Sequence, residues 1–201
     1  ISTKDLLTKV VLTSIASLSW KKSMKWADKD LFWGRPLRAI LAIYNKKILP
    51  FSYGHLRSTE STIIEKDLNI KYKKIKNFNE YQNFLKKNKI ILDQKEREKK
   101  ILKKFKTICS TKYFKPIFDS KLLSEVVNIV EDPNVLLIEF SKDYLQIPKE
   151  VIISTLQTHQ RYFPLFDRKE RLTNFFLVVA NKNDEKNFIK NGNKRVVEAR
   201  L

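Results

Sequence analysis

Apolar residues recur at helical spacing in six stretches of the chain. Residues 4–18 place leucine, isoleucine and valine on one face, with Thr3 and Asp5 near the start, as is common at helix N-termini. Residues 79–87 and 93–108 are predicted as the next two helices. The second of these has only a thin apolar stripe with lysine on every other side, which is typical of a surface helix.

Three further helices are predicted in the second half of the chain. Residues 120–130 are amphipathic, and their first residue, Ser120, is a candidate N-cap. Residues 148–157 begin with a proline, which suits the first helical turn. A last helical run starts near Asp184 and reaches Leu201 without a stop signal, so a truncated helix is expected there.

Short apolar runs bounded by turn residues predict strands. Residues 135–140, 162–166 and 174–180 are the strongest, and the last two are joined by a charged turn at 167–171. Helices and strands follow no regular alternation. The pattern therefore favours the α+β class, with mixed helices packed on an antiparallel sheet.

The N-terminal part of the chain gives weaker patterns. Residues 37–44 fit a buried strand or a short helix, and residues 37–53 are predicted as a β-hairpin with its turn at Asn45-Lys46-Lys47. Pro50 places the returning strand at an edge, because proline cannot donate to a ladder. Weak alternation over 62–76 predicts one more strand.

These patterns divide the chain into four regions. A first helix either belongs to a preceding domain or links from one; an aromatic-rich hairpin region, a lysine-rich helical segment and an α+β segment with a truncated helix follow. The regions cover residues 1–19, 20–68, 69–118 and 119–201, respectively. The chain starts at Ile1 rather than methionine, and with the open last helix this predicts an internal piece of a longer protein.

The formal net charge of +19 changes this picture, because it indicates a polyanionic partner such as nucleic acid. Residues 71–115 alone hold 16 lysines and arginines against 4 acidic residues. Lysine, isoleucine and asparagine are abundant throughout, however, so a solvated surface with no specific partner explains the charge equally well. No stretch reaches the roughly 18 to 20 apolar residues of a membrane span, so no membrane partner is expected. The single cysteine, Cys109, fits a reducing compartment.

Residues 155–164 hold the densest group of chemically useful side chains. His159 and Arg161 could form a catalytic or phosphate-binding pair, since histidine is the usual general base and arginine suits phosphate. No nucleophile or carboxylate stands at a recognisable spacing from them, so structural roles at a helix-to-strand junction are favoured. We expect no catalytic residue in the chain, and no metal site, because one cysteine and two histidines match no ligand pattern.

Six blocks of the chain, taken in order, resemble the β subunit of bacterial glycyl-tRNA synthetase. The blocks are Met24-Lys25-Trp26 with Arg35-Pro36, Leu122 to Pro133, Pro148-Lys149-Glu150, His159-Gln160-Arg161-Tyr162-Phe163-Pro164, Thr173 to Asn181, and Gly192-Asn193 to Leu201. The match covers nearly the whole chain but only an N-terminal to central part of the family's long subunit. Thr59 to Leu68 departs from the family's Gly-His-Arg-Phe block, whose histidine and arginine are missing there.

The resemblance implies a body-type region of a larger cytoplasmic subunit in an α2β2 ligase. In that family the α subunit holds the aminoacylation site for glycine, ATP and Mg²⁺, so no cofactor is expected in this fragment. The β subunit binds and positions tRNA(Gly). The fragment is expected to support tRNA binding and subunit assembly without activity of its own.

The resemblance and the charge together give two sets of site residues. Asn193 is expected to cap a helix that brings Arg195 and Arg200 near a nucleic-acid backbone. The candidate tRNA contacts are Arg161, Arg195, Arg200, Lys99, Lys100, Lys103 and Lys104. The expected structural motif is Arg35, Pro36, His159, Gln160, Tyr162, Phe163, Pro164, Gly192 and Asn193. The alternative is a purely structural scaffold between domains or subunits, supported by the aromatic residues of 20–53.

Overall fold

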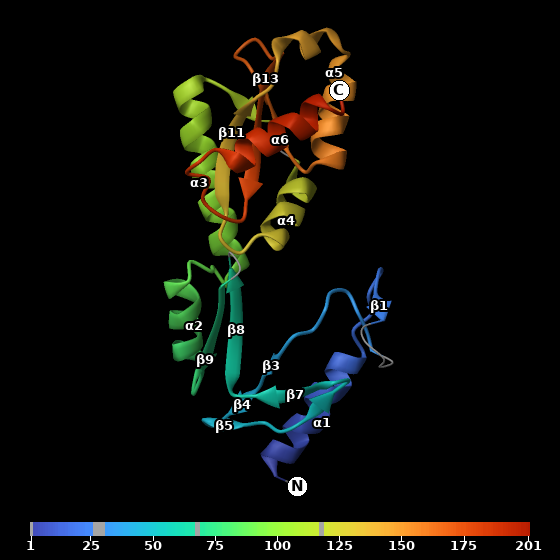
Figure 1. The fold of residues 1–201 in the computed structure, drawn as a ribbon, viewed down its shortest axis with the longest axis vertical. Coiled ribbons are helices and arrows are strands. Elements are labelled where there is room, and N and C mark those ends of the chain that lie inside the picture. Colours follow the sequence, from blue (N-terminus) through green and yellow to red (C-terminus); the bar gives the residue numbers. More distant parts are fainter. Residues whose placement is uncertain (1, 26–30, 67–68, 117–118) are drawn as a thin grey trace. The chain divides into compact units, whose positions relative to one another are not determined.

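The computed structural model describes residues 2–25, 31–66, 69–116 and 119–201 and divides them into two compact units. The first unit spans residues 1–84 and the second spans residues 85–201. The elements mix helices with small, mostly antiparallel sheets, so the α+β class is confirmed (Figure 1).

The first unit contains several short strands, one complete helix and the start of a second helix. The complete helix has no buried residue. The helices are α1 (Thr3–Ala16) and α2 (Phe78–Lys87), the latter crossing the unit boundary. The strands are β1 (Met24–Lys25), β2 (Phe32–Trp33), β3 (Ile40–Leu41), β4 (Ile43–Tyr44), β5 (Lys47–Ile48), β6 (Ser52–Tyr53), β7 (Leu56–Thr59), β8 (Ser61–Lys66) and β9 (Asn69–Lys74).

A tight hairpin forms within the predicted range 37–53, but its paired strands cover only residues 43–48, and β3 pairs in parallel with β7 instead. β4 pairs with β5, and Asn45 and Lys46 between them both have positive φ, as a two-residue hairpin turn of matching twist requires. The weak alternation over 62–76 hides two strands instead of one, since β8 and β9 pair antiparallel. The region 69–118, expected to be helical, therefore opens with a strand.

The second unit holds the main core. Its helices are α3 (Gln94–Lys112), α4 (Ser120–Ile129), α5 (Lys149–Ser154) and α6 (Phe188–Glu198), with a 3-10 turn at Lys142–Gln146 and a π turn at Thr155–His159. Its strands are β10 (Lys115–Pro116), β11 (Asn134–Glu139), β12 (Phe163–Phe166) and β13 (Leu172–Ala180). They form one antiparallel sheet in the order β10-β12-β13-β11.

Each face of this sheet carries its own helical layer, because successive side chains of a strand point to opposite faces. Phe163 and Leu177 pack with α3 and α4, whereas Phe176 and Val178 pack with α5 and α6. Figure 1 shows β11 and β13 between α3 and α5. The sheet thus lies between a layer formed by α3 and α4 and a layer formed by α5 and α6.

The ends of the helices correct three predictions. Asp119, and not Ser120, caps α4: its carboxylate accepts from the backbone N–H groups of Lys121 and Leu122. Asn193 lies inside α6, whose N-cap position is Asn187, and the Asp184 carboxylate accepts from the Ile189 and Lys190 N–H groups of the first turn. The last helix ends at Glu198, before the end of the chain.

Candidate nucleic-acid interface

Helix α3 presents the densest group of lysines. Asp93 caps its start by accepting the Glu96 N–H at 2.9 Å, and Ile101 and Phe105 are fully buried against the sheet. Residues three and four apart share a helical face. Burial of one face therefore places Lys99 and Lys103 on the opposite one.

The α3 lysines differ in how far their charge is neutralised. The Lys100 ammonium lies 3.1 Å from Asp132, a carboxylate with a side chain only 9% exposed. Lys99, Lys103 and Lys104 are exposed and form no ion pair with any residue in the described part of the chain. Three of the four predicted α3 contacts thus have charges available to a ligand.

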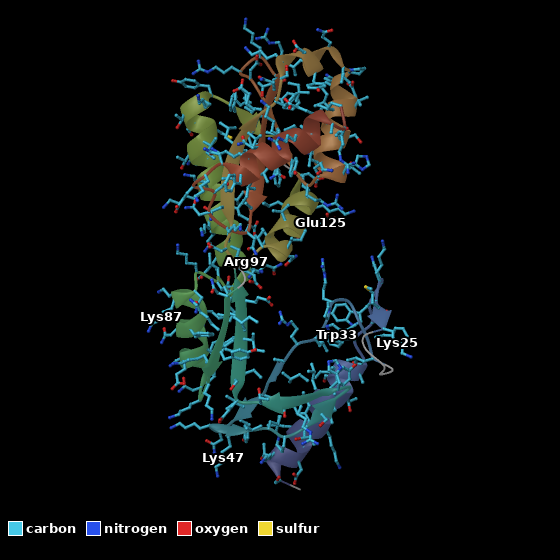
Figure 2. All side chains as sticks on the ribbon, viewed as in Figure 1. Lys25, Trp33, Lys47, Lys87, Arg97 and Glu125 are labelled. Atoms are coloured by element: carbon cyan, nitrogen blue, oxygen red, sulfur yellow. The ribbon has the colours of Figure 1, made fainter. Side chains whose placement is uncertain are left out.

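Arg97 shows what a structural cation on the same helix looks like. Its guanidinium donates to the carbonyl oxygens of Val127, Ile91 and Leu92 at 2.8 to 3.0 Å, which joins the start of α3 to the end of α4. Figure 2 shows Arg97 at this end of α3 and Glu125 on α4. The Arg97 guanidinium therefore has a structural role, since it is hydrogen-bonded to these backbone carbonyls.

Arg161 is also held within the fold. Its Nε lies 2.8 Å from the Glu125 carboxylate, and Nη1 donates to the Thr158 carbonyl. Arg161 has a backbone φ of 61°, in the left-handed region that residues other than glycine rarely adopt. It lies two residues after the π turn, which ends at His159. This geometry turns the chain from helix into β12 and confirms the predicted helix-to-strand junction.

Arg195 and Arg200 lie in the other layer. Both are exposed, Arg195 on α6 and Arg200 just after its end. Burial raises the pKa of Tyr162, and the nearby positive charge of Arg200 opposes that rise. The α3 lysines and these two arginines therefore lie on opposite sides of the sheet, so the predicted contacts do not form one surface.

Two of the expected motif residues, Tyr162 and Asn193, meet inside the second unit. Tyr162 stacks on Phe176 with ring centroids 5.1 Å apart, and its hydroxyl donates to the Asn193 side chain. Asn193 in turn donates to the Ile189 carbonyl at 2.7 Å. One hydrogen bond thus joins residues 155–164 to the last block, between residues 31 positions apart in sequence.

The remaining motif residues are divided between core and surface. Phe163 and Pro164 are buried in the sheet, Gln160 is half-buried and His159 is exposed. Gly192 lies in the middle of α6, where an added Cβ would meet nothing within 4 Å. In the first unit Arg35 and Pro36 are exposed, and Trp26 of the same block lies outside the described residues.

Two asparagines with structural roles were missed from the sequence. Asn181 accepts the N–H groups of Glu131 and Asp132 at 2.7 and 2.9 Å, and so ties the end of β13 to the turn before β11. Asn174 is 4% exposed and donates to the Phe140 carbonyl at 2.7 Å. Asparagine is rare in strands, so the presence of Asn174 inside an apolar strand pattern was the available signal for that residue.

The departing stretch, 59–68, runs from the end of β7 through β8, and its last two residues lie outside the described part. Gly54 and His55 form the turn just before it, between β6 and β7. Gly54 has a φ of 59°, and an added Cβ would lie 2.8 Å from Leu31. The turn therefore requires glycine on two counts.

Neither a metal centre nor a membrane helix is found in the ranges that the structure describes. No three histidine, cysteine or carboxylate groups there gather closely enough to hold an ion. The same ranges contain no helix with the length and apolarity to cross a bilayer.

Comparison with known proteins identifies the family. The profile described as Glycyl-tRNA synthetase beta subunit matches residues 1–201. The glycine–tRNA ligase β subunits of Rickettsia peacockii (strain Rustic) and Rickettsia conorii (strain ATCC VR-613 / Malish 7) are both 37% identical over 199 residues. That of Rickettsia felis (strain ATCC VR-1525 / URRWXCal2) is 34% identical over 201 residues.

Each alignment covers 98% of this chain but only 30% of the relative. The chain thus spans about 30% of the length of these relatives. It is related to one subunit of an aminoacyl-tRNA synthetase. More narrowly, the chain belongs to the glycyl-tRNA synthetase β-subunit family.

Proposed function

We propose that this chain is a non-catalytic part of the β subunit of a cytoplasmic α2β2 glycyl-tRNA synthetase. It supports binding of tRNA(Gly) for ATP-dependent glycylation, and ATP and Mg²⁺ act in the α subunit. The observation that carries the proposal is the lysine face of α3, defined as Lys99, Lys103 and Lys104. These charges lack described acidic partners, while the opposite side of the same helix is anchored in the core.

The contrast between cations on this helix supports a role in RNA contact. Arg97 and Lys100 are committed to carbonyls and to Asp132, so the fold uses some of the helix's cations for its own stability. The lysine face adds nothing comparable to the fold. Phosphate contacts of this kind supply affinity and position a nucleic acid without reading its sequence.

Arg161 has the weaker case, because Glu125 already neutralises it. Arg195 and Arg200 remain candidates for a second contact, on the α5–α6 side of the sheet. A tRNA reaching both sides would have to pass around the edge of the unit. The α3 side is therefore the primary interface in this proposal.

The alternative function is a purely structural scaffold between domains or subunits. Exposed large apolar side chains in the first unit favour it, since such residues suit protein contacts better than RNA contacts. They include Leu6, Val10, Leu18, Met24 and Phe32. Trp20 and Trp33, with ring centroids 4.8 Å apart, lie close to this group in the sequence.

The salt dependence of tRNA(Gly) binding by the α2β2 complex separates the two functions. The test variant carries Lys99→Gln, Lys103→Gln and Lys104→Gln. Each lost phosphate contact removes about 0.7 to 0.9 from the slope of log affinity against log salt, so a decrease of about 2 to 3 is expected. The matched control removes three lysines of the α5–α6 side, Lys142, Lys149 and Lys186.

An unchanged slope in the test variant, with the α2β2 complex intact, would reject the α3 interface in favour of the scaffold. An equal decrease in both variants would show that any loss of charge has the same effect, and would also contradict a localised interface.

A further inference from the structure

A preformed cation–aromatic pair lies where α3 ends. The Arg168 guanidinium carbon is 3.6 Å from the centre of the Tyr113 ring. Tyr113 is the residue that ends α3, with a φ of 56°. Arg168 belongs to the turn between β12 and β13, so two separate segments of the second unit create the pair.

The surrounding turn holds Arg168 in place and satisfies its own acids. Asp167 accepts from the Lys169 and Arg171 N–H groups at 2.8 and 2.9 Å, and its carboxylate also pairs with the Arg171 side chain. Glu170 lies 3.7 Å from Lys115. Both carboxylates beside Arg168 therefore already have cationic partners.

Arg168 itself has no acidic partner in the described part of the chain. Among the described residues its guanidinium makes no hydrogen bond or ion pair, so its N–H groups remain available as donors. Tyr113 is 62% exposed, so much of its side chain is open to a ligand. A planar cation and an exposed ring thus lie together, and neither serves the core.

The pair continues the lysine side of α3. Lys99, Lys103 and Lys106 follow one another at helical spacing, and Tyr113 comes seven residues after Lys106, which keeps it near the same side. The helix rises 1.5 Å per residue, so the row from Lys99 to Tyr113 is about 21 Å long. Positive charge along this row leads to a stacking group at its end.

We propose that Tyr113 and Arg168 form a nucleotide-binding site for an unpaired nucleotide of the bound tRNA. The base stacks on the face of the tyrosine ring that Arg168 does not cover, and the adjacent phosphate accepts from the guanidinium. Aromatic and arginine planes bind unstacked bases in this way, and arginine matches phosphate geometry. The site rests on the proposed tRNA function and adds to it a contact with a base.

The test uses the full α2β2 complex and tRNA(Gly), with binding measured over a range of salt. Tyr113→Leu is expected to weaken binding about 5- to 100-fold with an unchanged salt slope, because stacking releases no counterions. Arg168→Gln is expected to weaken binding and reduce the slope by about 0.7 to 0.9. Tyr113→Phe should bind almost normally, since it keeps the ring.

Two controls keep the result interpretable. Lys142→Gln removes one exposed charge from the other layer and should leave tRNA affinity nearly unchanged. Arg168→Lys keeps the charge in an exposed turn and loses the plane. Arg168→Lys should weaken tRNA binding without changing its salt slope. This result tests the site independently of any effect of Tyr113→Leu on the end of α3.

Three results would overturn the site. The first is unchanged tRNA affinity in both Tyr113→Leu and Arg168→Lys. If only the α3 lysine variant then weakened tRNA binding, the proposed function would still hold without this site. If Tyr113→Leu weakened the binding of heparin and the binding of tRNA equally, base stacking would be excluded, because heparin has no bases. Loss of α2β2 assembly with normal tRNA affinity in the remaining complex would make the pair a subunit contact.

Discussion

At the scale of single residues, polar side chains join segments that are distant in sequence. Tyr162 bonds Asn193, Arg161 pairs with Glu125, and Asn181 accepts from the turn before β11. Partners of this kind depend on the folded path of the chain. The sequence therefore identified Arg161, Tyr162 and Asn193 as noteworthy without revealing what each one contacts.

Loss of Asn181 should destabilise the turn before β11. Asn181→Ala leaves the Glu131 and Asp132 N–H groups without their acceptor, and we expect a loss of about 1–3 kcal/mol in the free energy of unfolding. Urea denaturation followed by circular dichroism measures it. Asn191→Ala, on the exposed side of α6, is the control and should cause no loss.

Asp167 should make the β12–β13 turn sensitive to acid. The backbone hydrogen bond from Arg171 is the main reason that the pKa of Asp167 lies below its usual 3.8, and the Arg171 side chain lowers it further. A lowered pKa in the folded state gives stability that is present above the usual value and lost as pH falls through the folded one. The stability difference between the native protein and Asp167→Asn should thus be constant from about pH 7 to 5 and shrink below about pH 4. A constant difference down to about pH 2 would contradict this role.

At the scale of elements, periodicity located the helices and the three long strands of the second unit. Such patterns are reliable where one face of a helix is buried, as in α4, and where a continuous apolar run forms a strand buried on both faces, as in β13. They were less informative where burial was slight: weak alternation over 62–76 predicted one strand where β8 and β9 form two, and β9 is exposed along its whole length. Helix ends were misplaced at α4 and α6, because capping depends on which carboxylate reaches the free N–H groups.

The position of Gly192 gives an element-scale prediction. Glycine inside a helix costs about 0.5–1 kcal/mol relative to alanine, and here a Cβ would meet nothing. Gly192→Ala should therefore raise the free energy of unfolding by about that amount, measured by thermal or urea unfolding. A lower stability would mean that α6 is distorted at this point.

At the scale of the whole molecule, the sheet of the second unit separates two sets of exposed basic residues. The candidate site could be predicted as a set of basic residues, but not as a surface, because sequence does not say which layer a helix joins. The α3 side carries unpaired lysines and the Tyr113–Arg168 pair, whereas the α5–α6 side carries Arg195 and Arg200. We therefore expect tRNA to lie against the α3 side of the sheet first.

Crosslinking of lysines to bound tRNA(Gly) in the α2β2 complex tests this most directly. Identification of the crosslinked peptides by mass spectrometry should find Lys99, Lys103 and Lys104 strongly enriched over Lys142, Lys149 and Lys186. High salt should abolish those crosslinks, because the contacts are to phosphate. Crosslinks confined to the α5–α6 lysines, or none in this part of the subunit, would contradict the account.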